Sequence, residues 1–313
     1  MNIILANPRG FCAGVDRAID ITNKALDIFG APIYVKHEIV HNKYVVDGLK
    51  ERGVIFIEDI AKVPEHSILI FSAHGVSDDI IKQSEKKNLK IFNATCPLVT
   101  KVHMEVLRLS LKNINTILIG HKGHPEVEGT IGRYISKSSS EMVLVENEND
   151  IVNLDFDINE EVAYVTQTTL SIDDTENIIN AIKNKYVNVI EPTKGDICYA
   201  TTNRQAAVKH LTEKCDIIFV VGSENSSNSN RLKEIATRAG VPSYLIDSAD
   251  DLDVKWLINK KNIGLTAGAS APEILVQSII TKLKRFGALD VIDSIGVEEN
   301  ITFKIPKELM IKR

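Results

Sequence analysis

Short apolar runs alternate with amphipathic segments along almost the whole chain, and this alternation constrains the fold more than any other feature. Most of the runs are followed by a loop and then by apolar residues at helical spacing. Strands that alternate with helices form parallel sheets, because each helix crosses back over the sheet. The sequence therefore predicts an α/β fold with mainly parallel sheets, with strands at 3–6, 33–35, 68–71, 90–92, 116–119, 142–145, 162–165, 187–190, 216–221, 243–246 and 262–265.

Length and charge indicate how many lobes the chain forms and which partners it does not bind. A chain of 313 residues is longer than the roughly 250 to 300 residues that one hydrophobic core serves, so we expect two or three lobes. The net charge of −5 gives no electrostatic basis for binding nucleic acid or an anionic membrane. No apolar run approaches the roughly 18 residues of a membrane span, and the first residues lack the basic part of a signal peptide. We therefore expect a cytoplasmic protein with reduced thiols.

Three cysteines stand where a predicted strand gives way to a predicted helix: Cys12, Cys96 and Cys198. They are far apart in the sequence, so their thiols meet only if the tertiary fold brings them together. Free N–H groups at a helix start favour thiolate over thiol, and three soft ligands suggest a metal cluster with one open position. The alternative is three buried, inert cysteines. Cys215, in contrast, continues the apolar stripe of a helix and is predicted to pack in the core.

Polar loops follow several predicted strands, which is where α/β folds usually bind ligands. His41, His74 and His124 each lie in such a loop, and residues 222–230 form a run of small hydrogen-bond donors before a helix. These groups are suited to an anion such as a diphosphate. The alternatives are structural histidines and an N-cap loop.

Three further polar residues have competing interpretations. Ser270 belongs to a similar loop, but with Glu273 it also fits a capping box. Glu126 is a candidate proton donor, because an enclosed carboxyl can stay protonated near neutral pH, although most glutamates are surface carboxylates. Thr168 offers a hydroxyl at another strand end, or else caps the following helix.

These residues belong to ordered motifs through which the chain resembles the 4-hydroxy-3-methylbut-2-enyl diphosphate reductase family over nearly its full length. The family is the iron-sulfur oxidoreductases that end the non-mevalonate pathway of isoprene biosynthesis. The matching motifs are residues 8–15, 38–42, 72–76, 94–97, 123–126, 166–171, 197–205, 225–230 and 266–270. One departure is Gly195-Asp196 before Ile197, where we expect Asp-Thr.

The resemblance implies a function for each of these residues. Cys12, Cys96 and Cys198 are expected to hold a 4Fe-4S cluster whose fourth iron binds the substrate hydroxyl, and flavodoxin or ferredoxin is expected to supply electrons. The implied reaction uses two electrons and two protons, releases water, and gives isopentenyl and dimethylallyl diphosphates. Glu126, Thr168 and His124 are the implied catalytic residues. The implied substrate-binding residues are His41, His74, His124, Thr168, Ser226, Ser227, Asn228 and Ser270.

The resemblance also implies three similar α/β lobes in a trefoil around the cluster. The expected limits are residues 13–96 for lobe 1, 97–195 for lobe 2, and 196–285 with 1–12 for lobe 3, followed by a C-terminal tail at 286–313. Non-redox dehydratases with the same type of cluster and a non-catalytic iron-sulfur sensor are the rival classes. A zinc deaminase is disfavoured, because His124-Pro125-Glu126 lacks the P-C-x-x-C partner.

Overall fold

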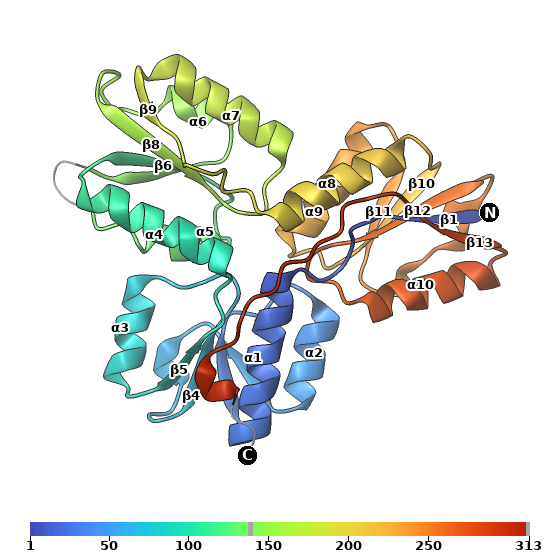
Figure 1. Cartoon of the computed structure of the whole chain (residues 1–313), viewed down its shortest axis with the longest axis horizontal. Helices are drawn as coiled ribbons and strands as arrows, with labels where there is room; N and C mark the ends of the chain where they lie inside the picture. The colour runs from blue at the N-terminus through green and yellow to red at the C-terminus, as the bar shows by residue number, and fades with distance from the viewer. Residues whose placement is uncertain (137–139, 311–313) are drawn as a thin grey trace. The chain divides into compact units, whose positions relative to one another are not determined.

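Three parallel β-sheets organise the chain in the computed structural model, which describes residues 1–136 and 140–310 (Figure 1). Sheet A has the strand order β11-β10-β12-β1-β13, sheet B the order β3-β2-β4-β5, and sheet C the order β7-β6-β8-β9. Every strand pairing in these three sheets is parallel. The predicted α/β class with parallel sheets is confirmed.

All the predicted strands form, within one or two residues of their expected ends, and two strands were not predicted, β3 and β13. The strands are β1 Asn2–Leu5, β2 Ile33–Lys36, β3 Val54–Ile57, β4 Ile68–Phe71, β5 Lys90–Asn93, β6 Asn115–Ile119, β7 Met142–Val145, β8 Glu161–Thr166, β9 Asn188–Ile190, β10 Ile217–Val221, β11 Ser243–Ile246, β12 Asn262–Ala267 and β13 Asp290–Asp293.

Helices follow most of the strands, as the sequence pattern requires. They are α1 Ala13–Phe29, α2 Lys43–Glu51, α3 Asp78–Lys86, α4 Pro97–Leu111, α5 Pro125–Ile131, α6 Glu148–Val152, α7 Ile172–Lys185, α8 Tyr199–Thr212, α9 Ser227–Arg238 and α10 Glu273–Arg285, with short 3₁₀ turns at Ile60–Lys62, Ala249–Asp251, Val254–Leu257 and Lys307–Leu309.

The chain divides into two compact units. Unit 1 comprises Met1–Asp16, Val40–Gly48 and Tyr199–Thr302, and unit 2 comprises Arg17–Ile39, Leu49–Cys198 and Phe303–Arg313, of which residues 137–139 and 311–313 lie outside the described part. Sheet A belongs to unit 1, and sheets B and C belong to unit 2. The predicted lobe limits stay a prediction.

The core of unit 1 covers both faces of sheet A. Ile217, Phe219 and Val221 of β10 pack with α10 on one face, and the alternate residues Ile218 and Val220 pack with α8 and α9 on the other. Successive side chains of a strand point to opposite faces, so a sheet covered on both sides needs a continuous apolar run. The sequence Ile-Ile-Phe-Val-Val of β10 meets that requirement.

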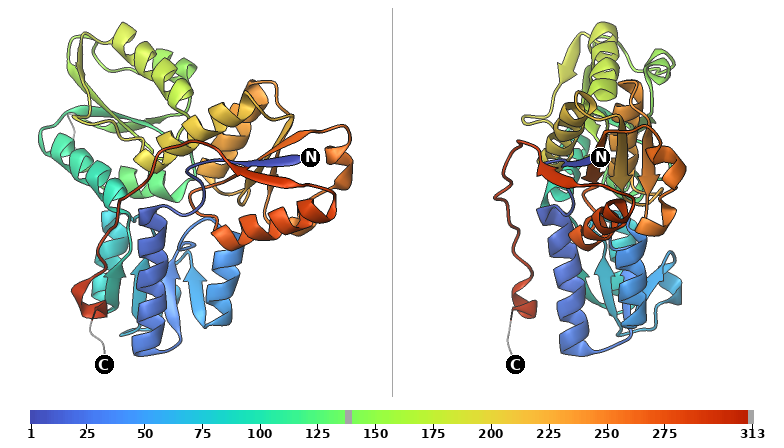
Figure 2. Two further views of the ribbon diagram at one scale, coloured as in Figure 1. Left: turned by 45° about the vertical axis from the view of Figure 1, so that its right-hand side comes forward. Right: turned by 90° about the vertical axis from the view of Figure 1, so that its right-hand side faces the viewer.

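Strand β1 lies inside sheet A, between β12 and β13 (Figure 2). Its neighbours in the sheet therefore come from the opposite end of the sequence. All four residues of β13 are exposed, and only two of them, Val291 and Ile292, are apolar, so this edge strand has only a weak apolar signal in the sequence. The strand falls within the predicted C-terminal tail.

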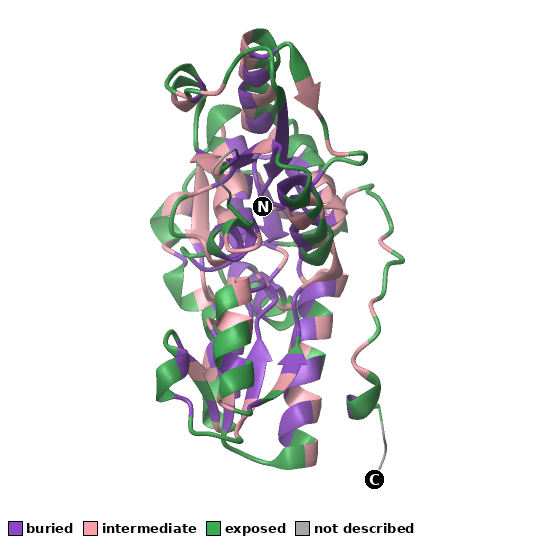
Figure 3. Cartoon of the chain, turned by 90° about the vertical axis from the view of Figure 1, so that its left-hand side faces the viewer, coloured by how far each residue is buried: buried purple, intermediate pink, exposed green. Residues whose placement is uncertain are grey.

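Unit 2 repeats the same layering in its own two sheets. In sheet C, α7 packs against one face through Ile178 and Ile182, and α4 packs against the other through Val106 and Leu109. In sheet B, the residues of α3 pack onto a cluster that includes Phe71 of β4. Figure 3 shows buried strands and helices that are exposed on their outer sides. Among the described helices, none has both the length and the hydrophobicity that a membrane span requires.

Candidate functional site

Cys12 lies in a tight turn between β1 and α1 in unit 1. Its backbone N–H donates to the Ala269 carbonyl (3.2 Å), and its own carbonyl accepts from Asp16 N (3.0 Å), which begins the helix. The N–H groups of Val15 and Gly14 favour the thiolate, as expected at a helix start, but burial is the larger effect and raises the pKa of the Cys12 thiol. Burial therefore favours the neutral form of this half-buried thiol.

Cys96 is the N-cap residue of α4 in unit 2, and Pro97 occupies the first helical position as predicted. Its N–H donates to the Ala73 carbonyl (2.9 Å), which ties it to the loop that follows β4. The Arg17 guanidinium donates to the Thr95 carbonyl (3.0 Å) and interacts electrostatically with Cys96. A neighbouring cation lowers the free energy of a thiolate.

Cys198 directly precedes α8 and is the last residue of the Leu49–Cys198 segment of unit 2. Its N–H donates to the carbonyl of Thr168 (3.0 Å), the residue that follows β8 by two positions. This hydrogen bond attaches a cysteine to the loop that carries a predicted catalytic threonine.

Cys215 differs from these three residues as predicted. It is buried among the residues that cover sheet A, with Val208, Leu211 and Ile218. Burial raises the pKa of its thiol to about 12. Cys215 is therefore a core residue.

The three half-buried thiols have the donor chemistry that a 4Fe-4S cluster requires. Each sits at a strand-to-helix junction, and Cys96 and Cys198 are both tied to loops at carboxyl ends of strands. Among the described residues, no group of three or more His, Cys, Asp or Glu side chains is placed to hold a metal ion. One shared centre for the three cysteines stays a prediction.

Glu126 and Thr168 form a buried hydrogen-bonded pair in unit 2. Glu126, in the first turn of α5, is 3% exposed, so it is not the surface carboxylate of the alternative interpretation. Its Oε1 accepts from Thr168 N (2.7 Å), and its Oε2 contacts Thr168 Oγ1 (3.0 Å). Burial raises the pKa of Glu126 to about 7, against the opposing effect of these two hydrogen bonds. Thr168 does not cap the next helix, because Ser171 is the N-cap of α7.

A second buried carboxylate interacts electrostatically with Glu126. Asp196, which is 5% exposed, accepts from Thr166 N (3.2 Å) and from Lys101 Nζ (3.2 Å). The negative charge of Asp196 raises the pKa of Glu126 further. Asp196, which stands where the resemblance predicts Thr, is therefore a buried acidic residue, and the sequence pattern did not predict its burial.

His74 and His124 meet edge to face, with ring centroids 5.7 Å apart. His124 is the N-cap of α5, where its Nδ1 accepts from Glu126 N (3.1 Å). A nitrogen that accepts this bond carries no proton, so in the neutral ring the proton is on Nε2. His124 therefore presents a donor at Nε2, and its Nδ1 is held by the backbone of Glu126.

The predicted anion-binding residues of unit 1 surround the first turn of α9. Ser226 is the N-cap and accepts from Ser229 N (3.3 Å), and Ser227 is the first helical residue. The Asn228 side chain accepts from Ala269 N (3.0 Å). Three hydroxyl and amide groups thus lie where the helix presents its N–H groups.

His41 and Ser270 are joined in the same unit. Ser270 Oγ donates to the His41 carbonyl (2.8 Å), and the side chain of Asn225 contacts His41 Nδ1 (3.4 Å). The alternative role of Ser270 in a capping box is wrong, because α10 begins after Pro272 without a side-chain cap.

The predicted site residues are divided between the two units. Unit 1 contains His41, Ser226, Ser227, Asn228, Ser270 and Cys12, and unit 2 contains His74, His124, Glu126, Thr168, Cys96 and Cys198.

The fold and these loops define the class of the protein: a parallel α/β protein in which predicted site residues follow the carboxyl ends of strands in both units. The chain matches the family model described as LytB protein over residues 3–284. It belongs to that family.

Known proteins of this family resemble the chain over almost its whole length. The 4-hydroxy-3-methylbut-2-enyl diphosphate reductase of Pectobacterium atrosepticum is 58% identical over 312 residues, covering 100% of this chain and 98% of the relative. The Pseudomonas aeruginosa protein of the same name is 57% identical, covering 100% and 99%. The solved E-1-hydroxy-2-methyl-but-2-enyl-4-diphosphate reductase of Plasmodium falciparum has a TM-score of 0.93 at 43% identity, covering 99% of this chain and 96% of that one.

Proposed function

We propose that this enzyme reductively removes the hydroxyl group of (E)-4-hydroxy-3-methylbut-2-enyl diphosphate and forms isopentenyl and dimethylallyl diphosphates. The overall reaction consumes two electrons and two protons, breaks the C–O bond and releases water. The relatives that carry this activity in their names, at 57% and 58% identity over the full chain, support the substrate. Flavodoxin or ferredoxin is the proposed electron donor, in the reducing environment of the cytoplasm.

The buried Glu126–Thr168 pair is the observation that carries the proposal. A carboxyl with a pKa of about 7 is half protonated at neutral pH, so it can deliver a proton to a departing hydroxyl. Thr168 Oγ1 contacts the same carboxyl and orients the hydroxyl end of the substrate. The hydrogen bond from Cys198 N to the Thr168 carbonyl supports the proposal that this proton donor acts close to a metal ligand.

The cofactor is proposed to be a 4Fe-4S cluster held by Cys12, Cys96 and Cys198. When bound, the cluster would supply electrons and an iron that acts as Lewis acid toward the substrate oxygen. The chain's own residues bind the other end of the substrate. Its diphosphate is proposed to accept hydrogen bonds from His41, His74, His124, Ser226, Ser227, Asn228 and Ser270.

Anaerobically purified protein tests the proposal. Iron and acid-labile sulfide are measured, and Mössbauer spectra are recorded with and without the hydroxylated diphosphate. We expect one distinct iron whose spectrum changes on addition of substrate. Zinc, or no metal after anaerobic reconstitution, would overturn the reductase assignment.

Glu126→Gln separates an enzyme from a sensor. The amide cannot give up a proton, so turnover should fall by at least about a hundredfold, the usual contribution of a positioned acid, while the iron content stays unchanged. Glu128→Gln is the matched control, because Glu128 is an exposed carboxylate on the same helix. Full turnover in Glu126→Gln would contradict the proton-donor role.

A further inference from the structure

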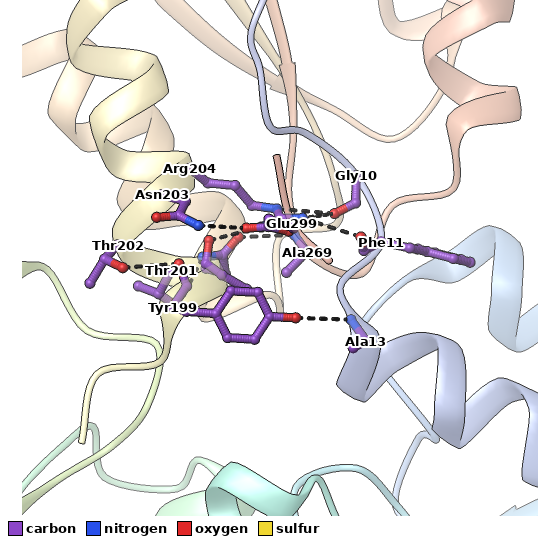
Figure 4. Close-up of polar contacts among 12 residues, drawn as sticks. Gly10, Phe11, Ala13, Tyr199, Thr201, Thr202, Asn203, Arg204, Ala269 and Glu299 are labelled. Atoms are coloured by element: carbon purple, nitrogen blue, oxygen red, sulfur yellow. Dashed lines mark hydrogen bonds and ion pairs between the residues drawn. The ribbon is translucent and has the colours of Figure 1, made fainter. Parts of the chain in front are cut away.

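A fully buried arginine in unit 1 is neutralised by a glutamate from the end of the chain (Figure 4). The Arg204 side chain is 0% exposed, and its Nη1 lies 3.1 Å from Glu299 Oε1. Its Nη1 and Nη2 both lie 3.2 Å from Glu299 Oε2, and the Asn203 amide donates to Oε1 (2.9 Å). Four contacts therefore fix this one carboxylate.

The other donors of Arg204 hold the turn that leads into Cys12. Nε and Nη2 donate to the Gly10 carbonyl (3.0 and 2.7 Å), and Nη2 also donates to the Phe11 carbonyl (3.2 Å). Nη1 donates to the Ala200 carbonyl (2.9 Å) in its own helix. The guanidinium thus bridges the Glu299 carboxylate and the two peptide units that precede Cys12.

The segment that delivers Glu299 runs along the first residues of the chain. Ser294 N donates to the Leu5 carbonyl (2.9 Å), one residue beyond the β1–β13 pairing. A Cβ atom at Gly296 would collide with the Asn7 carbonyl, so glycine permits the close approach of the two backbones. Residues 294–299 therefore follow residues 5–11 closely enough for Glu299 to reach Arg204.

Removing the Glu299 charge would leave a buried cation with carbonyl partners alone. Such a cation is costly without a counter-charge, so the guanidinium would move toward solvent or water would enter. Either change loosens the hydrogen bonds to Gly10 and Phe11. Two other hydrogen bonds of the turn would remain. Gly10 N donates to the Ala267 carbonyl (3.1 Å), and Cys12 N donates to the Ala269 carbonyl (3.2 Å).

We propose that Glu299 is a positioning residue that acts through Arg204 to fix the backbone of residues 10–12 and so the direction of the Cys12 thiol. The inference rests on the proposed function for the identity of the metal that Cys12 binds. The geometric claim concerns the thiol itself and holds in the metal-free protein.

Alkylation of the metal-free protein with iodoacetamide tests the claim, with each cysteine quantified by peptide mass spectrometry. In Glu299→Gln we expect Cys12 to react on the order of tenfold faster than in the wild type, because a local opening replaces a fixed turn. Cys215 reports on unit 1 as a whole and should keep its slow rate. Glu298→Gln is the matched control, because Glu298 is the exposed neighbour of Glu299.

Glu299→Asp is the second variant. It keeps the charge that neutralises Arg204, so it should fold, but its shorter side chain cannot keep all four contacts. We expect an intermediate Cys12 rate, which is the partial rescue that a positioning role requires. Wild-type Cys12 reactivity in both variants, or a parallel rise at Cys215, would overturn the proposal.

The iron-loaded enzyme provides an independent readout. Iron loss to a chelator should be several-fold faster in Glu299→Gln than in Glu298→Gln. If the wild type binds no iron, the proposed function fails, while the alkylation result still decides the role of Glu299.

Discussion

Glu126 is a residue whose local environment makes protein stability depend on pH. Burial raises its pKa to about 7 in the folded protein, compared with 4.5 for an ordinary glutamate. The folded state therefore binds the proton more tightly than the unfolded state. Its contribution to stability is fully present below pH 4.5 and is lost as the pH rises through 7.

Glu126→Gln should therefore gain stability relative to the wild type between pH 4.5 and 7.5. The full change in the difference between their unfolding free energies should be on the order of 3 kcal/mol. Urea unfolding of both proteins across this pH range measures it. The exposed Glu128→Gln control should run parallel to the wild type, and a pH-independent difference for Glu126→Gln would show that the carboxyl titrates normally.

The cysteines differ at the same scale. Cys215 is a core side chain, 8% exposed, whereas Cys12, Cys96 and Cys198 are half-buried at helix starts. Cys215→Ser should keep iron and activity and lose about 1 to 3 kcal/mol of stability, because a hydroxyl replaces a buried thiol.

Serine at Cys12, Cys96 or Cys198 should abolish cluster retention and turnover. Wild-type iron content in any of these three variants would remove that residue from the ligand set.

Helix α5 is joined closely to the loop that carries His74. Asp78 N donates to the Gly132 carbonyl (3.2 Å), and the Asp78 carboxylate pairs with Arg133. A Cβ atom at Gly132 would collide with Ser77. The C-terminal end of α5 is therefore fixed to the start of α3, while its N-terminal end carries His124 and Glu126.

Gly132→Ala should push these two elements apart. Overpacking of this kind costs about 1 to 3 kcal/mol, and the displaced helix should lower kcat by moving Glu126. Thermal unfolding and steady-state kinetics measure the two effects. Gly195→Ala is the control, because a Cβ atom there meets nothing within 4 Å. A wild-type kcat for Gly132→Ala would show that α5 tolerates the shift.

Helix α9 combines a structural cap with a proposed ligand site. Ser226→Ala should cost about 1 kcal/mol of stability through loss of the N-cap and should also raise KM for the diphosphate substrate. Ser171→Ala is the matched variant, since Ser171 caps α7 by the same hydrogen-bond pattern. It should cost similar stability without a change in KM. Equal KM values would leave Ser226 as a cap alone.

The sequence pattern predicted most of the elements whose residues are buried, but it missed β3, in which Val54 and Ile57 are buried. The strands of the three sheets and the start of α4 at Pro97 follow from apolar runs and helix-start chemistry. The exposed strand β13 has only two apolar residues, Val291 and Ile292, and it joins the sheet through backbone pairing with β1. Glu299 was missed because its partner Arg204 lies in a helix that is remote in sequence, and no local motif links the two residues.

Iron removal is a test at the scale of the whole molecule. The three proposed ligands belong to both units, Cys12 to unit 1 and Cys96 and Cys198 to unit 2. Chelation of the anaerobic protein should abolish turnover, and iron with sulfide should restore it. Since metal binding contributes to folding free energy, the metal-free protein should also unfold at a lower temperature. An unchanged unfolding temperature after complete iron loss would show that the metal does not contribute to stability.

The position of β1 inside sheet A sets an order of events during synthesis. The ribosome adds roughly 5 to 20 residues per second, so about 15 to 60 seconds separate Cys12 from Glu299. Until β12 and β13 emerge, β1 lacks both of its neighbours in the sheet. The first cysteine to be made is thus the last to acquire its final surroundings, and a cluster delivered to the nascent chain would find no ordered ligand there.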